Sequence, residues 1–195
     1  MHELDPGWTA PTKLQRGNAF DKVQVYLCGH NDGSAMVRRL ALRLVEHLRL
    51  LTDEIDELTA EITVRVTRSA PSLLAIVGCG ALSAAKIIGE TAHAGRFRSK
   101  DAYARHNGTA PLPVWSSNKQ RHRLSRTGNR QLNAALHRIA LTQARCYPPA
   151  RELLERRTNG GDGGMEALRI LKRRLSDVVY RAMLADQTDP APIAA

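Results

Sequence analysis

Aromatic side chains are scarce in this chain: Phe, Trp and Tyr together make up 4 % of its 195 residues. Proteins that hold single-stranded nucleic acid by base stacking need several exposed rings along one groove. The composition therefore argues against a stacking platform of that kind.

Cysteine is also rare, and its three copies, Cys28, Cys79 and Cys146, lie far apart. The absence of a CxxC pair argues against a zinc site and a disulfide framework and suits a reducing cytoplasm. No other metal-ligand set is visible in the sequence. No stretch of 18 apolar residues exists and the N-terminus lacks signal-peptide character, so we expect no membrane span and a cytoplasmic location.

What the chain has in excess is positive charge. It contains 29 Lys and Arg residues against 19 Asp and Glu, a formal net charge of +10. Such an excess points to a polyanionic partner, with nucleic acid first and an anionic membrane surface second. Since aromatic residues are few, binding to the phosphates of a duplex or of structured RNA fits better than base stacking.

The two ends of the chain show the weakest patterns. Residues 1–35 have no sustained hydrophobic period, which predicts an irregular lead-in with one candidate strand, Val23–Leu27. The last residues, 186–195, read QTDPAPIAA after their first position, and we expect them to be disordered.

A long helix is predicted over residues 36–68, with Ser34 in position to cap it. Its apolar residues recur at alternating steps of three and four, as in a coiled coil. The first half of the helix is basic and the second half acidic, so an antiparallel partner would match opposite charges. The pattern fits a dimer seam and an intramolecular packing helix equally. The apolar stripe comprises Val37, Leu40, Leu44, Leu48, Leu51, Ile55, Leu58, Ile62 and Val66.

A second pattern follows Pro71, which ends the long helix. Two short apolar helical segments at Leu73–Glu90 flank Gly78 and Gly80, an arrangement that resembles a helix-hairpin-helix element. In such elements the glycines let the backbone approach a DNA phosphate. The alternative is a tight turn between two packed helices, in which Cys79 is a small packed residue.

The central stretch, residues 108–128, is predicted to be a Pro-rich basic loop that carries the serine pair Ser116 and Ser117. A hydroxyl nucleophile beside several cations suits chemistry on a phosphate group. The alternative is a solvated polar loop. The cations of this stretch are Lys119, Arg121, Arg123 and Arg126, with His122 as a further candidate, and Arg130 follows just after the stretch.

Gly128 and Asn129 then open an amphipathic helix that runs to Cys146, on which Leu132, Leu136 and Ile139 share a face. Its N-terminus offers unpaired N–H groups to an anion. Shorter helices are predicted elsewhere: Lys100–His106 after the cap Ser99, Pro149–Arg157, and Met165–Leu184 after the NGGDGG hinge. The predicted fold is mainly α: a long coiled-coil-type helix followed by a compact helical domain over residues 69–185.

The order of these features resembles the C-terminal half of the insertion-sequence 110 (116/902) family of transposases, the bridge-RNA-guided DNA recombinases of bacterial mobile elements. The resemblance covers roughly residues 35–185. It is carried by LLAIVGCGALSAAKIIGE at 73–90, NGTAP at 107–111, the serine pair, LSRTGNRQLNAALH at 124–137 and the terminal ALRILKRRLSDVVYRAML.

The resemblance implies a nucleophilic serine, which the family usually writes Ser-Gly before its LSR-x-G-N motif. Counting back from Leu124 places it at Ser116, and Ser117, in the position of the glycine, is the second choice. NGGDGG also departs from a Gly-Lys pair that relatives tend to have. The residues that we expect to contact nucleic acid are Gly78, Gly80, Lys119, Arg121, His122, Arg123, Arg126, Asn129 and Arg130.

The family also carries an N-terminal ribonuclease-H-like domain, whose Asp, Glu, Asp and Asp hold metal ions. Residues 1–35 offer Glu3, Asp5, Asp21 and Asp32 without strands to cluster them. We therefore expect an N-terminally truncated member with no cofactor or metal in this chain, and Mg²⁺ only through the missing domain.

Two functions follow as hypotheses. The first is a truncated transposase that acts on double-stranded DNA with a guide RNA, in the bacterial nucleoid, as a homo-oligomer joined through the 36–68 helix. The second is a catalytically inactive DNA- or RNA-binding and dimerisation module. A serine hydrolase is disfavoured because no G-x-S-x-G elbow is present.

Overall fold

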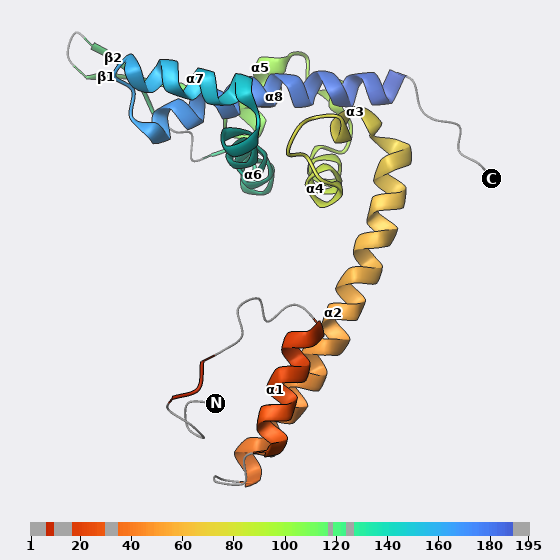
Figure 1. The fold of residues 1–195 in the computed structure, drawn as a ribbon. Helices are drawn as coiled ribbons and strands as arrows, with labels where there is room; N and C mark the ends of the chain where they lie inside the picture. The colour runs from red at the N-terminus through yellow and green to blue at the C-terminus, as the bar shows by residue number, and fades with distance from the viewer. Residues whose placement is uncertain (1–6, 10–16, 30–34, 117–118, 124–126, 189–195) are drawn as a thin grey trace. The chain divides into compact units, whose positions relative to one another are not determined.

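The computed structural model describes residues 7–9, 17–29, 35–116, 119–123 and 127–188, and of residues 113–116 and 119–123 it describes the backbone alone. Eight α-helices dominate these residues, so the prediction of a mainly α fold is confirmed. The chain divides into two compact units, residues 1–61 and 62–195 (Figure 1). Among the described residues no helix is long and apolar enough to cross a membrane.

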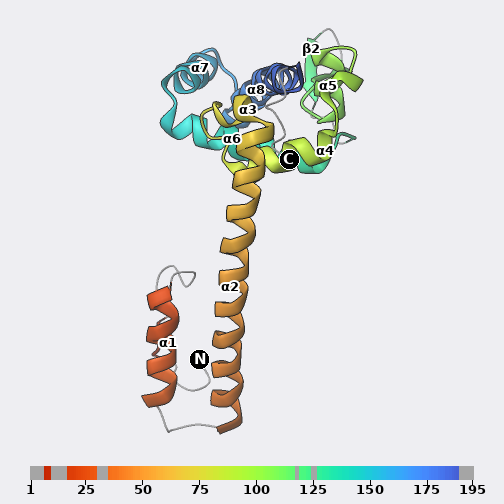
Figure 2. The ribbon, with the colours of Figure 1, turned by 90° about the vertical axis from the view of Figure 1, so that its right-hand side faces the viewer.

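Unit 1 contains helix α1 (Gly17–Gly29) and the first part of helix α2 (Ala35–Ser69), which lie side by side in Figures 1 and 2. The prediction of an irregular lead-in with a strand at Val23–Leu27 is wrong over this range. Phe20, Val23 and Leu27 are spaced by three and four and are buried, which is the pattern of one helix face. That spacing, within only three turns, is what the sequence reading overlooked.

Helix α2 spans 35 residues and covers the predicted 36–68 helix, while Ser34, its predicted cap, lies outside the described residues. Helix α1 packs against Val45, with Ala41 and Leu42 beside it. It therefore covers a face of α2 other than the predicted stripe. The stripe residues in unit 1 are largely exposed: Leu40, Leu44, Leu48, Leu51, Ile55 and Leu58.

The core of unit 2 forms around helix α8 (Gly164–Thr188), which packs against five elements. These are α3 (Pro71–Leu74), the 3₁₀ turn η1 (Ala94–Arg96), α5 (Lys100–His106), α6 (Arg130–Cys146) and α7 (Pro148–Asn159). Helix α4 (Ala81–Thr91) packs against α6. The predicted apolar face of α6 is confirmed, since Leu132, Leu136 and Ile139 are fully buried.

The bounds of α5 and α6 match the prediction, and Ser99 caps α5 by accepting a hydrogen bond from the Ala102 N–H at 3.2 Å. Helix α8 extends into the tail that was predicted to be disordered, because tertiary contacts hold its last turn. The Asp186 carboxylate accepts a hydrogen bond from the Ser72 N–H at 3.0 Å, and Gln187 accepts one from the Gly95 N–H at 3.4 Å. The final residues, 189–195, lie outside the described residues.

The predicted basic loop contains a β-hairpin, which corrects the expectation that residues 108–128 form a loop without regular structure. Strand β1 (Leu112–Ser116) pairs antiparallel with strand β2 (Lys119–Arg123). Val114 and Trp115 favour extended backbone, and β2, whose five residues are all polar, offers no apolar helix face. Backbone pairing, which a hydrophobic period does not report, decides this segment.

Candidate nucleic-acid interface

The hairpin brings five of the predicted site residues together. Ser116 is the last residue of β1, and its backbone partner is Lys119, the first residue of β2. Arg121, His122 and Arg123 follow on β2, opposite Val114, Pro113 and Leu112. Ser117 and Arg126 lie outside the described residues. The candidate nucleophile and four candidate phosphate ligands therefore occupy two paired strands.

The first half of the hairpin base is built around Asn107, which is fully buried at the end of α5. Its Nδ2 donates a hydrogen bond to Ser176 Oγ of α8 at 2.8 Å. Its Oδ1 accepts hydrogen bonds from the Thr109 hydroxyl at 2.7 Å and the Thr109 N–H at 3.1 Å. A buried polar side chain is stable only when such partners are present, so the chain direction into β1 is fixed here.

The second half of the base packs onto the first at two glycines. A Cβ atom at Gly128 would lie 2.3 Å from both Cα and N of Gly108, a distance that no side chain tolerates. Gly108 itself has φ +72°, a conformation that favours glycine. The Asn129 N–H then donates a hydrogen bond to the His106 carbonyl at 2.7 Å. We call residues 106–109 and 128–129 the hairpin clamp.

Asn129 joins the clamp to two helices. Its Oδ1 accepts hydrogen bonds from the N–H groups of Gln131 and Leu132, which caps α6, and its Nδ2 donates to Glu90 Oε2 at 2.7 Å. The cap agrees with the prediction that Asn129 opens this helix, and the bonds to Glu90 and His106 add a structural role that the sequence did not indicate. Its contact with nucleic acid stays a prediction. Arg130, the first residue of α6, is exposed.

The two glycines predicted to meet DNA lie in the turn between α3 and α4, and their surroundings differ. Gly78 has φ +83°, and a Cβ there would lie 3.0 Å from Thr142 Cβ, so this glycine is packed against α6. Gly80 is exposed at the N-cap of α4, with no atom within 4 Å of its Cβ position. Only Gly80 is open to an approaching backbone. The helix-hairpin-helix function stays a prediction.

Cys79, between these glycines, is buried, as the packed-residue interpretation expects. Burial raises the pKa of its thiol from 9.0 to about 11, which keeps it protonated and unreactive at neutral pH. No group of three or more His, Cys, Asp or Glu that could hold a metal ion occurs within the described ranges.

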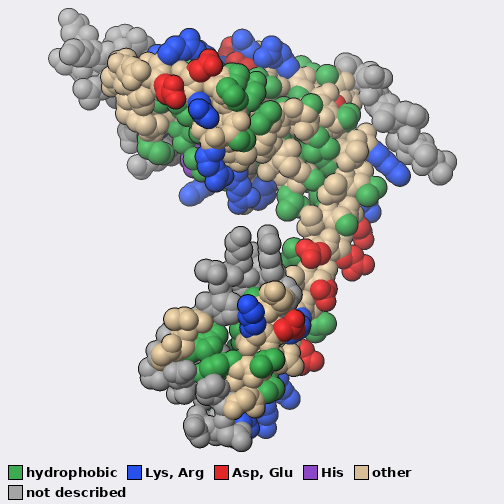
Figure 3. All heavy atoms as spheres, in the orientation of Figure 1, with side chains coloured by type: hydrophobic (Ala, Val, Ile, Leu, Met, Phe, Trp, Pro, Cys, Tyr) green, Lys and Arg blue, Asp and Glu red, His purple; other side chains and the backbone are tan. Residues whose placement is uncertain are grey.

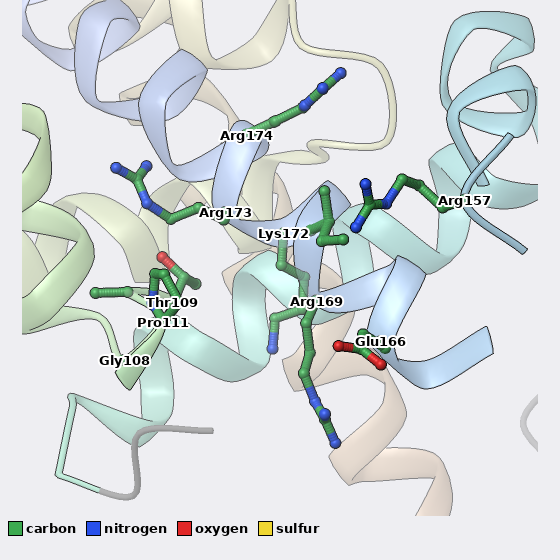
Figure 4. Close-up of a pocket in the computed structure, with 11 residues that line it drawn as sticks. Gly108, Thr109, Pro111, Arg157, Glu166, Arg169, Lys172, Arg173 and Arg174 are labelled. Carbon is green, nitrogen blue, oxygen red and sulfur yellow. The ribbon is translucent and has the colours of Figure 1, made fainter. Parts of the chain in front are cut away.

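Unit 2 also carries exposed Lys and Arg side chains outside the hairpin. On the face drawn in Figure 3 they gather over α6 and α7, where Arg138, Arg145, Arg151 and Arg156 are exposed. A further group lines a cavity of about 410 Å³ beside the clamp, which the sequence reading missed (Figure 4). The spacing of Arg169 and Lys172 on one helix face was the only sequence signal for it.

Comparison with known proteins gives one family. No curated protein matches the chain. Residues 70–155 match the model of the Transposase IS116/IS110/IS902 family. The matched range contains α3 to α6, the hairpin, its clamp and most of α7. This part of the chain is therefore similar to the transposases of that family, which supports a general function in DNA transposition or recombination.

Proposed function

We propose that this chain acts in DNA transposition or site-specific recombination and that Ser116 is the nucleophile that attacks a DNA phosphodiester. The observation that carries the proposal is the family match over residues 70–155, since it includes the whole hairpin and both halves of the clamp. The net charge of +10 supports a polyanionic substrate.

In the proposed step, the Ser116 hydroxyl oxygen forms a bond to phosphorus and the bond from phosphorus to one strand-end oxygen breaks. The hydroxyl proton leaves to a base, and the departing oxygen takes up a proton. A serine hydroxyl needs activation, and the charge that develops on the phosphate oxygens needs cations. Directly paired positions in an antiparallel ladder are neighbours, so Lys119 is a first candidate for that cation.

The clamp supports this role mechanically. A nucleophile on a hairpin with a loose base would lose orientation, and orientation contributes much of the rate of such reactions. Here the two chain segments at the foot of the hairpin are held by the hydrogen bonds of the buried Asn107 side chain and by the contact of Gly108 with Gly128. The family implies Mg²⁺, but the described residues do not contain a fitting cluster of ligands, so we assign no step to a metal.

The exposed stripe of α2 supports a homo-oligomer. Apolar residues that repeat at coiled-coil spacing and face solvent in one chain are typical of a seam. The stripe is flanked by Arg38, Arg39 and Arg43 in its first half and by acidic residues in its second, so we propose an antiparallel second copy as the partner. Replacing Leu44 and Ile55 by Glu should reduce the mass measured by light scattering to that of one chain, whereas Glu57→Gln should not.

The catalytic proposal is tested by looking for a covalent adduct. The full chain is incubated with magnesium, labelled duplexes from the DNA that flanks its coding sequence, and RNA transcribed from the same flanks. The products are separated under denaturing conditions. Parallel reactions contain Ser116→Ala and Ser117→Ala, which test the two adjacent hydroxyls against one another.

An adduct that is lost only in Ser116→Ala supports the proposal, and loss only in Ser117→Ala moves the nucleophile by one residue. Salt-sensitive binding without any adduct overturns the catalytic role and favours the alternative, a DNA- or RNA-binding and dimerisation module. A reaction without the RNA tests whether adduct formation needs a guide RNA, whose role stays a prediction.

A further inference from the structure

The cavity beside the clamp is lined by two parts of unit 2. One wall is the loop that leads into β1, with Gly108, Thr109, Ala110 and Pro111. The other wall is formed by Arg157 of α7 and by Glu166, Arg169, Ile170, Lys172, Arg173 and Arg174 of α8. The lining thus contains five cations and one carboxylate. Figure 4 shows that Arg174 points away from the loop wall.

Two of the remaining cations already have counter-ions. Arg157 Nε lies 2.5 Å from an Asp162 carboxylate oxygen, and Arg173 is paired with Asp101 and Asp177. Arg169 and Lys172 differ from them. Within the described parts of the chain, no carboxylate oxygen lies within 4.0 Å of either side-chain charge. The cavity therefore has two cations whose charge the protein does not neutralise by direct contact.

Lys172 is the more unusual of the two, because it is only 7 % exposed. Its Nζ donates a hydrogen bond to Asn133 Oδ1 at 2.6 Å, and Asn133 Nδ2 donates to the Asn107 carbonyl at 2.9 Å. Burial and the nearby charge of Arg169 lower the pKa of Lys172. An ammonium has three donors, so one neutral acceptor leaves it short of partners. An anion in the cavity would supply them.

We propose that Arg169 and Lys172 form a binding site for a backbone phosphate of nucleic acid at the root of the hairpin. The inference rests on the proposed function for the identity of the ligand. Pro111 of the cavity wall directly precedes Leu112, the first residue of β1, and Ser116 lies four residues further along the extended strand, about 13 Å from Leu112. A DNA strand covers that length in roughly four base-pair steps, so a phosphate bound in the cavity and one at Ser116 can belong to the same strand.

Hydrogen bonds of the clamp connect Lys172 with the start of the hairpin. Thr109 of the loop wall donates two hydrogen bonds to the Asn107 side chain, and the Asn107 carbonyl accepts a hydrogen bond from Asn133, the partner of Lys172. A phosphate held by Lys172 is therefore held relative to the residue that starts the path into β1. Glu166 opposes anion binding, because it is an exposed carboxylate in the lining of the cavity and weakens the attraction for an anion.

The test measures the binding of a fluorescein-labelled DNA duplex to the full chain by anisotropy, from about 50 to about 200 mM salt. Arg169→Gln removes an exposed charge with little effect on folding, and Lys172→Met removes the buried one. Arg181→Gln is the matched control, since it lies on the same helix about 18 Å from Arg169, is exposed and loses the same charge. Thermal melts establish that each variant is folded.

We expect Arg169→Gln and Lys172→Met each to weaken binding about tenfold and to reduce the salt slope by about one phosphate contact. Glu166→Gln should tighten binding, and Arg181→Gln should change it less than twofold. Equal losses in Arg169→Gln and Arg181→Gln, or no loss in either cavity variant, would overturn the site.

These outcomes are separable from the failure of the proposed function. Binding that depends on Arg169 in a chain that forms no Ser116 adduct removes the catalytic role and keeps the phosphate site. An adduct that forms equally well in Arg169→Gln and Lys172→Met, with unchanged affinity, keeps the catalytic role and removes the site. A wild-type chain that does not bind DNA removes both.

Discussion

Among the described glycines, Gly128 is the one at which an added Cβ meets the nearest atoms, so Gly128→Ala should damage the hairpin clamp. The new Cβ would lie 2.3 Å from Cα and N of Gly108 and 2.9 Å from the Asn107 carbonyl carbon. All three neighbours are backbone atoms, so no side-chain rotation relieves the contact. Overpacking of this kind costs about 1–3 kcal/mol, and backbone neighbours place this case at the upper end.

The displacement also threatens the hydrogen bond from the Asn129 N–H to the His106 carbonyl, which contributes about 1 kcal/mol. We therefore expect a loss of about 3–4 kcal/mol in the free energy of unfolding of unit 2, or roughly 10–15 °C in its melting temperature. Gly89→Ala is the control: nothing lies within 4 Å of its Cβ position in α4, so it should be neutral or stabilising by up to about 1 kcal/mol.

Unit 2 has a local reporter for this experiment. When Cys28 and Cys146 are replaced by Ser, the buried Cys79 is the one remaining thiol. Its alkylation during a urea titration then reports the unfolding of unit 2 alone. If Gly128→Ala unfolds within about 1 kcal/mol of the parent, the close packing of the two glycines is wrong and the clamp argument fails with it.

Three further predictions concern the core of unit 2. The pKa of the Cys79 thiol is 9.0 in the unfolded chain and about 11 in the folded one. The free energy of unfolding from urea titrations should therefore be highest below pH 9 and fall by up to about 3 kcal/mol as the pH rises toward 11. Cys79→Ala should flatten this fall. Asn107→Ala removes three hydrogen bonds from a fully buried position and should cost about 3 kcal/mol in urea unfolding; a loss below about 1 kcal/mol would contradict the assigned network. Leu136→Ala should cost about 2–5 kcal/mol, whereas Leu141→Ala on the same helix, 42 % exposed, should cost much less in the same assay.

The helices of unit 2 could be read from the sequence because their cause is local. The bounds of α5 and α6 follow from a capping residue, from an apolar face at a helical period and from Gly or Pro at the ends. Helix α1 shows the limit of this method. The burial of Phe20, Val23 and Leu27 makes sense only once Val45 of α2 is beside them, and three turns are too short to reveal a period.

The candidate site divides in the same way. Charge and residue type pointed to the serine pair and the cations that follow it, because chemistry on phosphate needs those groups whatever the fold, and the family resemblance then favoured Ser116 over Ser117. The pairing of Ser116 with Lys119 was not predictable, since a two-stranded ladder is held by backbone hydrogen bonds to a partner strand. The roles of Gly128 and Asn129 were also hidden, because both act on residues some twenty or more positions away.

The sequence by itself determined the helical class and the positive charge, through local periodicity and composition, and the likeness to a transposase, through the order of its motifs. Only the tertiary structure decided that α1 covers one face of α2 and leaves the part of the stripe from Leu40 to Leu58 exposed. It also decided that a clamp of distant residues orients the hairpin and that Lys172 is buried beside a cavity. The physical reason is that burial and close contact are properties of pairs of residues, and the chain order does not state which pairs meet.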